Sequence, residues 1–425
     1  MSLDPTKVST RIAALTDKWT MVDALYGGTS TMRQAVRYLP RNSKESEIDW
    51  RPRLNRTSLY NVYKRSIQQA AARIFAEDIV LEGFPPEMNV FIQDVDAQGR
   101  DITQFIKADF IDALNRGVSY ILVEYPKREE QPLTLADALV TGERPYWVQI
   151  EATQVLAAHS ALSGGIERLT HFRFKETVME VSDDGLEETL HEQVKAFYQT
   201  AVGEPVTFRV WRNHKTKGWM VVDQGTLLGQ PAIPVVPIYT NRTGFYLGAP
   251  PLLDLAETNI AHWQSSSEQR NILHVARVPF LHINGLPQEF DDKGKLVAVE
   301  VNIHSALVTS DPAAKAQWIE TNGNALAAGA ADLADLEAKM DALGLSLSTP
   351  RSGTSTATEN SINAAEANSL LKDMARSLSD SIELALYYTA FYLDVDPNTN
   401  GKVTVSTKFA VDLQETSTTP ETDQA

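Results

Sequence analysis

The sequence predicts an α+β protein of two or three domains, in which helices come first, an antiparallel sheet follows and long helices end the chain. Three observations predict this fold class. Apolar residues recur at spacings of three and four near the N-terminus and in the last third. Residues 145–237 alternate apolar and polar side chains instead. A length of 425 residues is enough for more than one core.

Composition places the chain among ordinary soluble proteins, with 43% hydrophobic and 22% charged residues. It contains no cysteine, which excludes disulfides, thiolate zinc sites, iron–sulfur clusters and cysteine nucleophiles. No apolar run approaches the roughly 18 to 20 residues of a membrane span, and the N-terminus has no apolar core typical of a signal peptide. We therefore expect a multi-domain protein made in the cytoplasm, with no membrane partner.

The net charge of −16 argues against a general nucleic-acid binder, because phosphate binding depends on lysine and arginine. The charge is distributed unevenly. Residues 1–65 carry 12 Lys/Arg against 6 Asp/Glu, whereas residues 321–425 carry 6 against 15. Two interpretations stay open: the opposite signs attract neighbouring copies of the chain, or the N-terminal charges form a solvated helix face.

The N-terminal part predicts three helices and one buried strand. A helix is expected over residues 4–26, ended by the Gly27–Gly28 pair, and a second over residues 54–76. A third covers residues 102–114 with Gly117 as its C-cap residue. The β-rich run VSYILVEYP that follows is typical of a strand buried on both faces.

The middle of the chain predicts one antiparallel sheet with a solvated face. Its strands, beginning with WVQI, are separated by turn signals at residues 163–165 and 183–185. The segment PAIPVVPIYTNRTG is expected to leave the sheet as a connector stiffened by proline.

The last third predicts three long helices. The first is followed by two strands, VPFLHING and KLVAVEVNIH, and a polar stretch of small residues precedes the third. A final strand, GKVTVSTKFAVDL, leads into a disordered tail. The helices are expected at residues 251–276, 324–343 and 361–393, and the polar stretch at 345–359.

The sequence offers little for catalysis. It has no G-x-G-x-x-G or P-loop, no G-x-S-x-G and no HExxH, and its eight histidines are dispersed. Acidic pairs lie in turn-like segments, which are usually solvated. We therefore expect no enzyme, no cofactor and no metal site. Trp211 and Trp219 flank the basic run RNHKTKG, which resembles a nucleic-acid platform; a hairpin with a basic tip is the favoured interpretation.

One segment carries a family resemblance, YGGTSTMRQAVRYLPRNSKESEIDWRPRLNRTSLYN. Its elements, and the order of the segments that follow, resemble tailed-bacteriophage portal proteins, the head-to-tail connectors, of a subfamily catalogued as a domain of unknown function. Val36 departs from the pattern, because relatives tend to have glycine there. The elements are Met32–Arg33, Tyr38 to Arg41, Glu45 and Glu47, Arg53 to Arg56, and Leu59 to Asn61.

The resemblance implies a portal-like subunit with a mixed α/β wing, a helical stem, a small β-containing clip and a long C-terminal helix, assembling into a ring. The crown domain would be short or absent. The implied parts are a wing at 1–249, stem helices at 250–276 and 321–345, a clip at 277–320, a tunnel loop at 346–360, a long helix at 361–395, and a terminal strand and disordered tail at 396–425.

The resemblance also implies a function and partners. Portal rings, usually of twelve subunits, occupy one capsid vertex of the virion and form the channel for genome packaging and ejection, after assembly in the host cytoplasm. Implied partners are the terminase large subunit, the major capsid protein and scaffold, the neck or tail adaptor, and double-stranded DNA passing without base readout. The alternative is a structural component of the head, neck or baseplate without a channel.

Two groups of site residues follow from this layout. Acidic residues of the second stem helix would line the channel and repel phosphates, and small polar residues of the tunnel loop would track the DNA, with Arg351 touching its backbone. A plain disordered linker is an equal alternative for the loop. The acidic group is Asp332, Asp335, Glu337 and Asp341; the loop group is Ser348, Thr349, Arg351, Ser352, Thr354 and Thr356.

Overall fold

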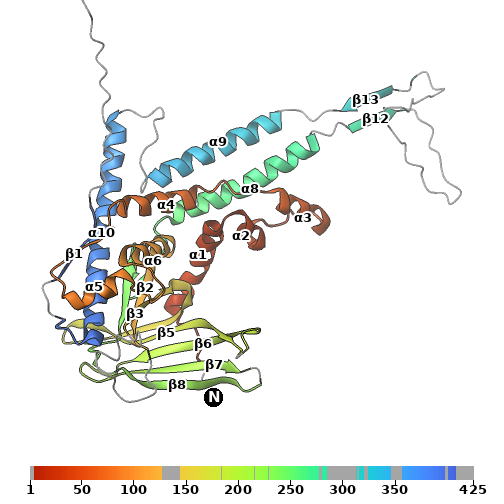
Figure 1. Cartoon of the computed structure of the whole chain (residues 1–425). Coiled ribbons are helices and arrows are strands. Elements are labelled where there is room, and N and C mark those ends of the chain that lie inside the picture. The colour runs from red at the N-terminus through yellow and green to blue at the C-terminus, as the bar shows by residue number, and fades with distance from the viewer. Residues whose placement is uncertain are drawn as a thin grey trace, which may run out of the picture. The chain divides into compact units, whose positions relative to one another are not determined.

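The computed structural model describes residues 4–126, 144–276, 280–284, 313, 315–319, 324–345, 357–397 and 401–407, except positions 183, 215 and 228. The chain is a mixture of helices and strands, which confirms the predicted α+β class (Figure 1). It forms two compact units, each built from separate stretches of sequence. The first comprises Met1–Thr31, Asn61–Asn259 and Met340–Ala425, and the second Met32–Tyr60 and Ile260–Lys339.

Capping residues set the ends of the helices in the first unit, and α1 begins six residues after its predicted start at residue 4. In α1 (Thr10–Gly27), the Ser9 side chain accepts a hydrogen bond from the Ile12 amide, and Gly28 ends the helix at a φ of 86°. Helix α6 (Ile102–Arg116) ends at Gly117 in the left-handed conformation, as predicted.

The single helix expected over residues 54–76 is wrong. Two helices occupy this region, α3 (Glu47–Arg56) and α4 (Val62–Ile74). Thr57 has extended backbone angles that end α3, and the Asn61 side chain accepts from the Lys64 amide to begin α4. The break is therefore encoded by capping residues.

Two antiparallel sheets form the centre of the first unit. Strand β2 (Val118–Glu124) pairs with β3 (Tyr146–Glu151) on one side and with β9 (Val235–Tyr239) on the other. The second sheet has five strands in sequence order, which agrees with the predicted antiparallel sheet. Its strands are β4 (Val155–Ser163), β5 (Ile166–Val181), β6 (Glu188–Tyr198), β7 (Val206–His214) and β8 (Gly218–Leu227).

Two expectations about this region are wrong. The segment WVQI belongs to β3 in the smaller sheet, and the predicted proline connector contains a strand, β9. Proline is compatible with β9 because this strand lies at the edge of its sheet, where an amide hydrogen is not needed on the open side.

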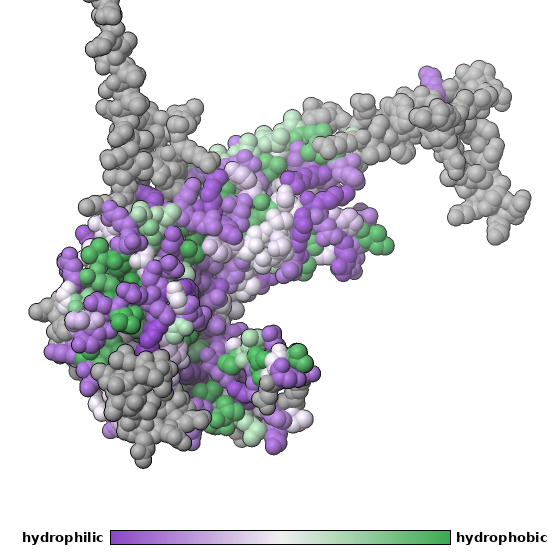
Figure 2. Space-filling view, in the orientation of Figure 1, coloured by the Kyte–Doolittle hydropathy of each residue, from purple (hydrophilic) through white to green (hydrophobic). Residues whose placement is uncertain are grey.

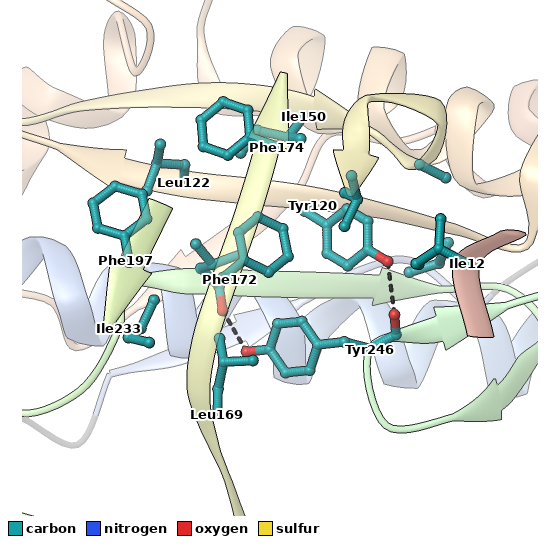
Figure 3. Packing of buried hydrophobic residues seen from close by; sticks show 14 of the residues in the cluster. Ile12, Tyr120, Leu122, Ile150, Leu169, Phe172, Phe174, Phe197, Ile233 and Tyr246 are labelled. Carbon is teal, nitrogen blue, oxygen red and sulfur yellow. Dashed lines mark hydrogen bonds between the residues drawn. The ribbon is translucent and has the colours of Figure 1, made fainter. Parts of the chain in front are cut away.

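The main core lies between the two sheets and α1 (Figure 3). Tyr120 and Leu122 of β2 point toward Phe172 and Phe174 of β5, and all four side chains are buried. The hydroxyl of Tyr120 donates to the carbonyl of Tyr246 (2.8 Å), and the Tyr246 hydroxyl donates to the carbonyl of Val235. Each buried phenol is therefore paired.

Helices cover the opposite face of β2. Ser119 of β2 donates to Asp109 of α6, and the Trp147 indole of β3 donates to Thr389 of α10 (2.9 Å). Helix α10 spans Ala357–Leu393 and begins four residues before the predicted position, so the end of the expected polar stretch is helical. Smaller elements of this unit are α5 (Pro86–Gln93), η2 (Ala152–Gln154), and the antiparallel pairs β1 (Val80–Glu82) with β14 (Lys402–Thr404) and β10 (Arg242–Gly244) with β11 (Leu247–Gly248).

The second unit is mainly helical. It contains most of α8 (Leu253–Ala276) and α9 (Asn324–Leu345), both close to their predicted bounds. Strand β12 (Phe280–Asn284) was expected from the sequence. Its antiparallel partner is β13 (Lys315–Ile319), which was not predicted as a strand. The predicted strand KLVAVEVNIH lies outside the described residues. The unit also holds η1 (Val36–Tyr38), α3 and the end of α2 (Thr29–Gln34).

We predict that Phe172→Ala destabilises the first unit by about 3–5 kcal/mol, because it removes a fully buried ring that contacts Tyr120 and Tyr246. Urea unfolding followed by tryptophan fluorescence measures the change. Leu162→Ala is the control, since that side chain is 76% exposed and its loss should cost less than about 0.5 kcal/mol. Equal losses in the two variants would contradict the described core.

Candidate functional site

The segment that carries the family resemblance is organised around a buried arginine. Arg53 is 3% exposed and makes a bidentate pair with Glu45, at 2.7 Å and 2.6 Å. It also donates to the Pro40 carbonyl (3.1 Å) and to the Ser267 hydroxyl of α8 (3.2 Å). Two other resemblance elements, Glu45 and Pro40, thus meet Arg53 in one hydrogen-bonded centre in the second unit.

Further bonds attach the same segment to α8. Arg33 donates twice to the Thr57 carbonyl (3.1 and 2.8 Å), and the Thr57 hydroxyl donates to Ser267 (2.8 Å). Gln264 of α8 donates to the Tyr38 carbonyl (3.0 Å). The resemblance identified this segment in the sequence but did not predict its structural role. In the structure, its arginines hold residues 33–57 against α8.

The four acidic residues predicted to line a channel lie on α9, and three have partners in the same chain. Asp332 accepts from the Ser265 hydroxyl (2.6 Å), and Glu337 lies 3.2 Å from the buried His262 ring. Asp341 pairs with Arg65 at 2.7 Å. Asp335 is exposed. The partner residues Ser265, His262 and Arg65 were not found from the sequence, because their positions carry no local signal.

Helix α9 approaches α8 closely within the second unit. A Cβ atom at Gly329 would lie 2.1 Å from the Gln269 Oε1 atom, and the Gln269 amide donates to the Leu326 carbonyl (2.9 Å). A side chain at position 329 would have to displace the end of the Gln269 side chain, so glycine allows α8 and α9 to approach closely here.

The predicted tunnel-loop residues Ser348, Thr349, Arg351, Ser352, Thr354 and Thr356 lie outside the described residues. Helix α9 ends at Leu345 and α10 begins at Ala357. The segment therefore joins the second stem helix of the predicted layout to the long helix, and its conformation stays a prediction. Most of the predicted clip also lies outside the described residues.

A cavity of about 630 Å³ opens in the first unit, between the ends of β2 and α10 and the strands β6 to β8. Two of its charged groups pair with each other: Lys195 donates to Glu124, which also accepts from the Tyr146 hydroxyl (3.3 Å). Nearby, burial raises the pKa of Glu176. Most of the remaining lining is aromatic or aliphatic, including Phe197, Phe208 and Tyr392. No local sequence pattern marks this cavity, because its residues come from six separate elements.

Asp109 is an acidic group buried beneath β2. It accepts a hydrogen bond from Ser119, and its Oδ2 atom has no hydrogen-bond partner within the part of the chain that the structure describes. Burial raises the pKa of Asp109 to about 8, and the Ser119 hydrogen bond opposes this shift. A carboxyl group of this kind is neutral in the folded protein at neutral pH.

The aromatic and basic run around Trp211 and Trp219 forms a β-hairpin, in which Asn213 lies opposite Trp219 and His214 opposite Gly218. This agrees with the favoured interpretation, a hairpin with a basic tip.

Within the described ranges, no group of three or more His, Cys, Asp or Glu residues could hold a metal ion. No described helix is long and apolar enough to cross a membrane.

One protein-family model matches part of the chain. The family described as "Domain of unknown function (DUF4055)" matches residues 251–393, a minority of the 425 residues. No curated protein matches the sequence.

Solved structures show distant similarity. The neck of an empty gene transfer agent particle computed with C6 symmetry matches at 12% identity and a TM-score of 0.42, over 82% of this chain and 81% of that one. A native gene transfer agent virion matches at 13% and 0.39, over 84% and 81%. The neck of the native particle computed with C12 symmetry matches at 12% and 0.41, over 82% and 81%. Similarity at this level establishes neither a shared fold nor a shared function.

We predict that Arg53→Ala destabilises the protein by about 3–5 kcal/mol, because it leaves the largely buried Glu45 carboxylate unpaired. The joint replacement Arg53→Met with Glu45→Met should cost less than Arg53→Ala alone. Arg51→Ala is the matched control: its ion pair with Glu47 is exposed and worth less than about 1 kcal/mol. Urea unfolding gives all three values, and equal losses for Arg53→Ala and Arg51→Ala would exclude the proposed buried centre.

We predict that Asp109→Asn changes the pH dependence of stability. Because the folded pKa is about 8 and the ordinary value is 3.8, the folded state binds more protons between these pH values. The free energy of unfolding should therefore fall as pH rises from about 4 to about 8. The Asn variant should lose this contribution and gain stability relative to wild type at pH 8. Unfolding at pH 5 and pH 8 measures it, with the exposed Asp335→Asn as control; a parallel response in both variants would contradict the assignment.

Proposed function

We propose that this chain is the portal subunit of a tailed bacteriophage, a non-enzymatic ring component through which genomic DNA enters and leaves the capsid. The observation that carries the proposal is the organisation of residues 253–393. Two helices, α8 and α9, are joined through the β12–β13 pair, and a short segment then leads to the 37-residue helix α10. This order agrees with the stem, clip, stem, tunnel loop and long helix that the resemblance implies.

The family match supports this assignment of parts, since residues 251–393 begin with α8 and end with α10. Under the proposal, residues 1–249 form the wing, the β12–β13 region forms part of the clip, and residues 346–356 form the tunnel loop. The ring would contain twelve subunits and would bind the terminase large subunit, the capsid and scaffold proteins, and later the tail adaptor. The chain would belong to the virion.

The electrostatics of α9 support passage of DNA without retention. Asp332 and Asp335 are exposed, and the partner of Asp332 is the neutral Ser265 hydroxyl, so neither has a cationic partner within the described residues. Negative groups on a channel wall repel phosphates and weaken binding to the backbone. Asp341 contributes less, because the Arg65 guanidinium lies beside it.

A second candidate is a structural component of the head, neck or baseplate that assembles without a channel. The Arg53 centre favours it as much as it favours the portal, because a rigid second unit serves either assembly. The two functions differ in whether DNA passes through the assembled particle.

Electron microscopy of the purified protein, with mass from light scattering, is the first test. We expect rings with a central hole of about 20 Å or more, wide enough for duplex DNA. A protein that stays monomeric in the presence of its capsid and scaffold proteins would contradict the portal function.

We predict that replacing residues 347–356 with a Gly/Ser segment of equal length abolishes DNA packaging and leaves ring assembly intact. The replaced residues lie between α9 and α10, so neither helix is changed. Packaged DNA protected from nuclease measures the first effect, and particle mass measures the second. A Gly/Ser replacement in the segment 127–143, within the proposed wing, is the control and should package normally. Normal packaging by both variants would favour the structural component without a channel.

A further inference from the structure

The hairpin of β5 and β6 extends beyond the rest of its sheet. Strand β4 pairs with β5 as far as Phe174, and β7 pairs with β6 from Gln193 onward. Residues 175–192 therefore form a ribbon of two strands, with no third strand beside it among the described residues. A two-stranded ribbon is marginally stable in water unless one face is covered.

One face of this ribbon is apolar and exposed. Met179 lies directly opposite Leu190, and Val181 lies on the same face two residues along the strand. Their exposures are 52%, 69% and 48%, and Leu186 in the turn is 82% exposed. Figure 2 shows apolar side chains among polar ones on the lobe formed by this end of the sheet. A group of large exposed aliphatic side chains marks a protein interaction surface.

The ribbon is also strongly acidic. Residues 175–192 contain seven Asp/Glu and one Lys. Glu188 and Glu192 lie on the same face as Met179, since they oppose Val181 and Thr177. On the other face Glu180 pairs with His191 (3.1 Å) and Arg212 (3.2 Å). A surface complementary to this face is therefore both apolar and basic.

The chain itself contains such a partner surface. Residues 36–56 contain six Lys/Arg and three Asp/Glu, in a protein whose net charge is −16. Ile48 on this segment is 84% exposed, and Val36 is 48% exposed. Arg41 and Lys44 are exposed before α3 begins and supply the positive charge beside Ile48, whereas the charge of Arg51 is offset by its pair with Glu47. We call the exposed residues Val36, Arg41, Lys44 and Ile48 the outer face of this segment. The buried pair of Arg53 with Glu45 holds the segment in place, so this face is preformed.

We propose that the ribbon of residues 175–192 docks on the outer face of residues 36–56 of a second copy of this chain. Aliphatic side chains on both surfaces lose contact with water, and the opposite charges select the pairing and strengthen it at low salt. Because two different patches meet, the contact is heterologous and repeats from copy to copy, which closes a ring or continues as a filament. The proposal requires self-association only and does not depend on a DNA channel.

The absence of cysteine allows a direct test by disulfide linking. Two single variants, Ile48→Cys and Leu186→Cys, are purified separately with tags of different mass, mixed in equal amounts and oxidised mildly. We expect a linked heterodimer and at least tenfold less linking within either variant alone. The variant carrying both substitutions should form a ladder of linked oligomers.

Leu162→Cys provides the matched control, since Leu162 is 76% exposed but lies on β4, opposite Glu167 at the end of the sheet away from the ribbon. It should link to Ile48→Cys at least tenfold less than Leu186→Cys does. Equal linking of the two, or linking of the double variant only within a single chain, would overturn the proposal. Protection of the Ile48→Cys thiol by duplex DNA, but not by the Leu186→Cys protein, would assign the basic face to DNA and also overturn it.

A second measurement separates loss of contact from loss of fold. Met179→Ser with Leu190→Ser should weaken self-association by about tenfold in sedimentation velocity at low salt, because central apolar contacts dominate interfaces. Thermal unfolding should stay unchanged, since both side chains are exposed. The pair Leu162→Ser with Ile166→Ser is the control. Unchanged self-association in the ribbon variant, or no self-association of the wild type, would contradict the proposal.

The outcomes also separate this contact from the proposed function. Rings with a central hole, together with no link between the two cysteine variants, would retain the portal and reject the contact. Specific linking in particles without a hole would retain the contact and reject the channel.

Discussion

Strand β2 is the constraint on which the first unit depends, because its first six residues are buried and both faces must therefore be covered. Tyr120 and Leu122 require an apolar layer, which the five-stranded sheet supplies through Phe172 and Phe174. The opposite face requires α6 and α10, which bring Asp109 and Thr389 to the sheet. A strand from the first third of the chain thereby joins the proposed wing to the proposed long helix in one unit.

The second unit depends on a different interaction, the pairing of a buried guanidinium. A charge removed from water is tolerated only when its hydrogen-bonding groups find partners, and Arg53 finds them in Glu45, Pro40 and Ser267. These partners lie before α3 and on α8, so the ion pair fixes residues 40–53 in place against α8. The recognisable sequence motif is thus explained by a structural requirement, whether or not the assembled protein conducts DNA.

The sequence predicted correctly those features that depend on neighbouring residues, such as helix ends and helix spacing. Gly117 ended α6, and the apolar spacing of α8 and α9 gave their bounds within two residues. The errors arose where distant contacts decide: β9 became a strand because it pairs with β2, and WVQI joined the smaller sheet for the same reason. The four acidic residues of α9 were found by charge, but His262 and Arg65 were not, because 75 and 276 residues separate them from their partners. The cavity near Glu124 has no sequence signature for the same physical reason.

The partners of the α9 carboxylates change how the acidity of this helix is understood. An ion pair such as Asp341 with Arg65 has little net field beyond about 8–10 Å, where salt screens what remains. A hydrogen bond from a neutral hydroxyl, as from Ser265 to Asp332, leaves the full negative charge in place. Under the proposed function, repulsion of phosphates by α9 therefore depends on the carboxylates without a cationic partner more than on the total number of acidic residues. Arg65 removes Asp341 from that set, whereas Asp332 and Asp335 belong to it.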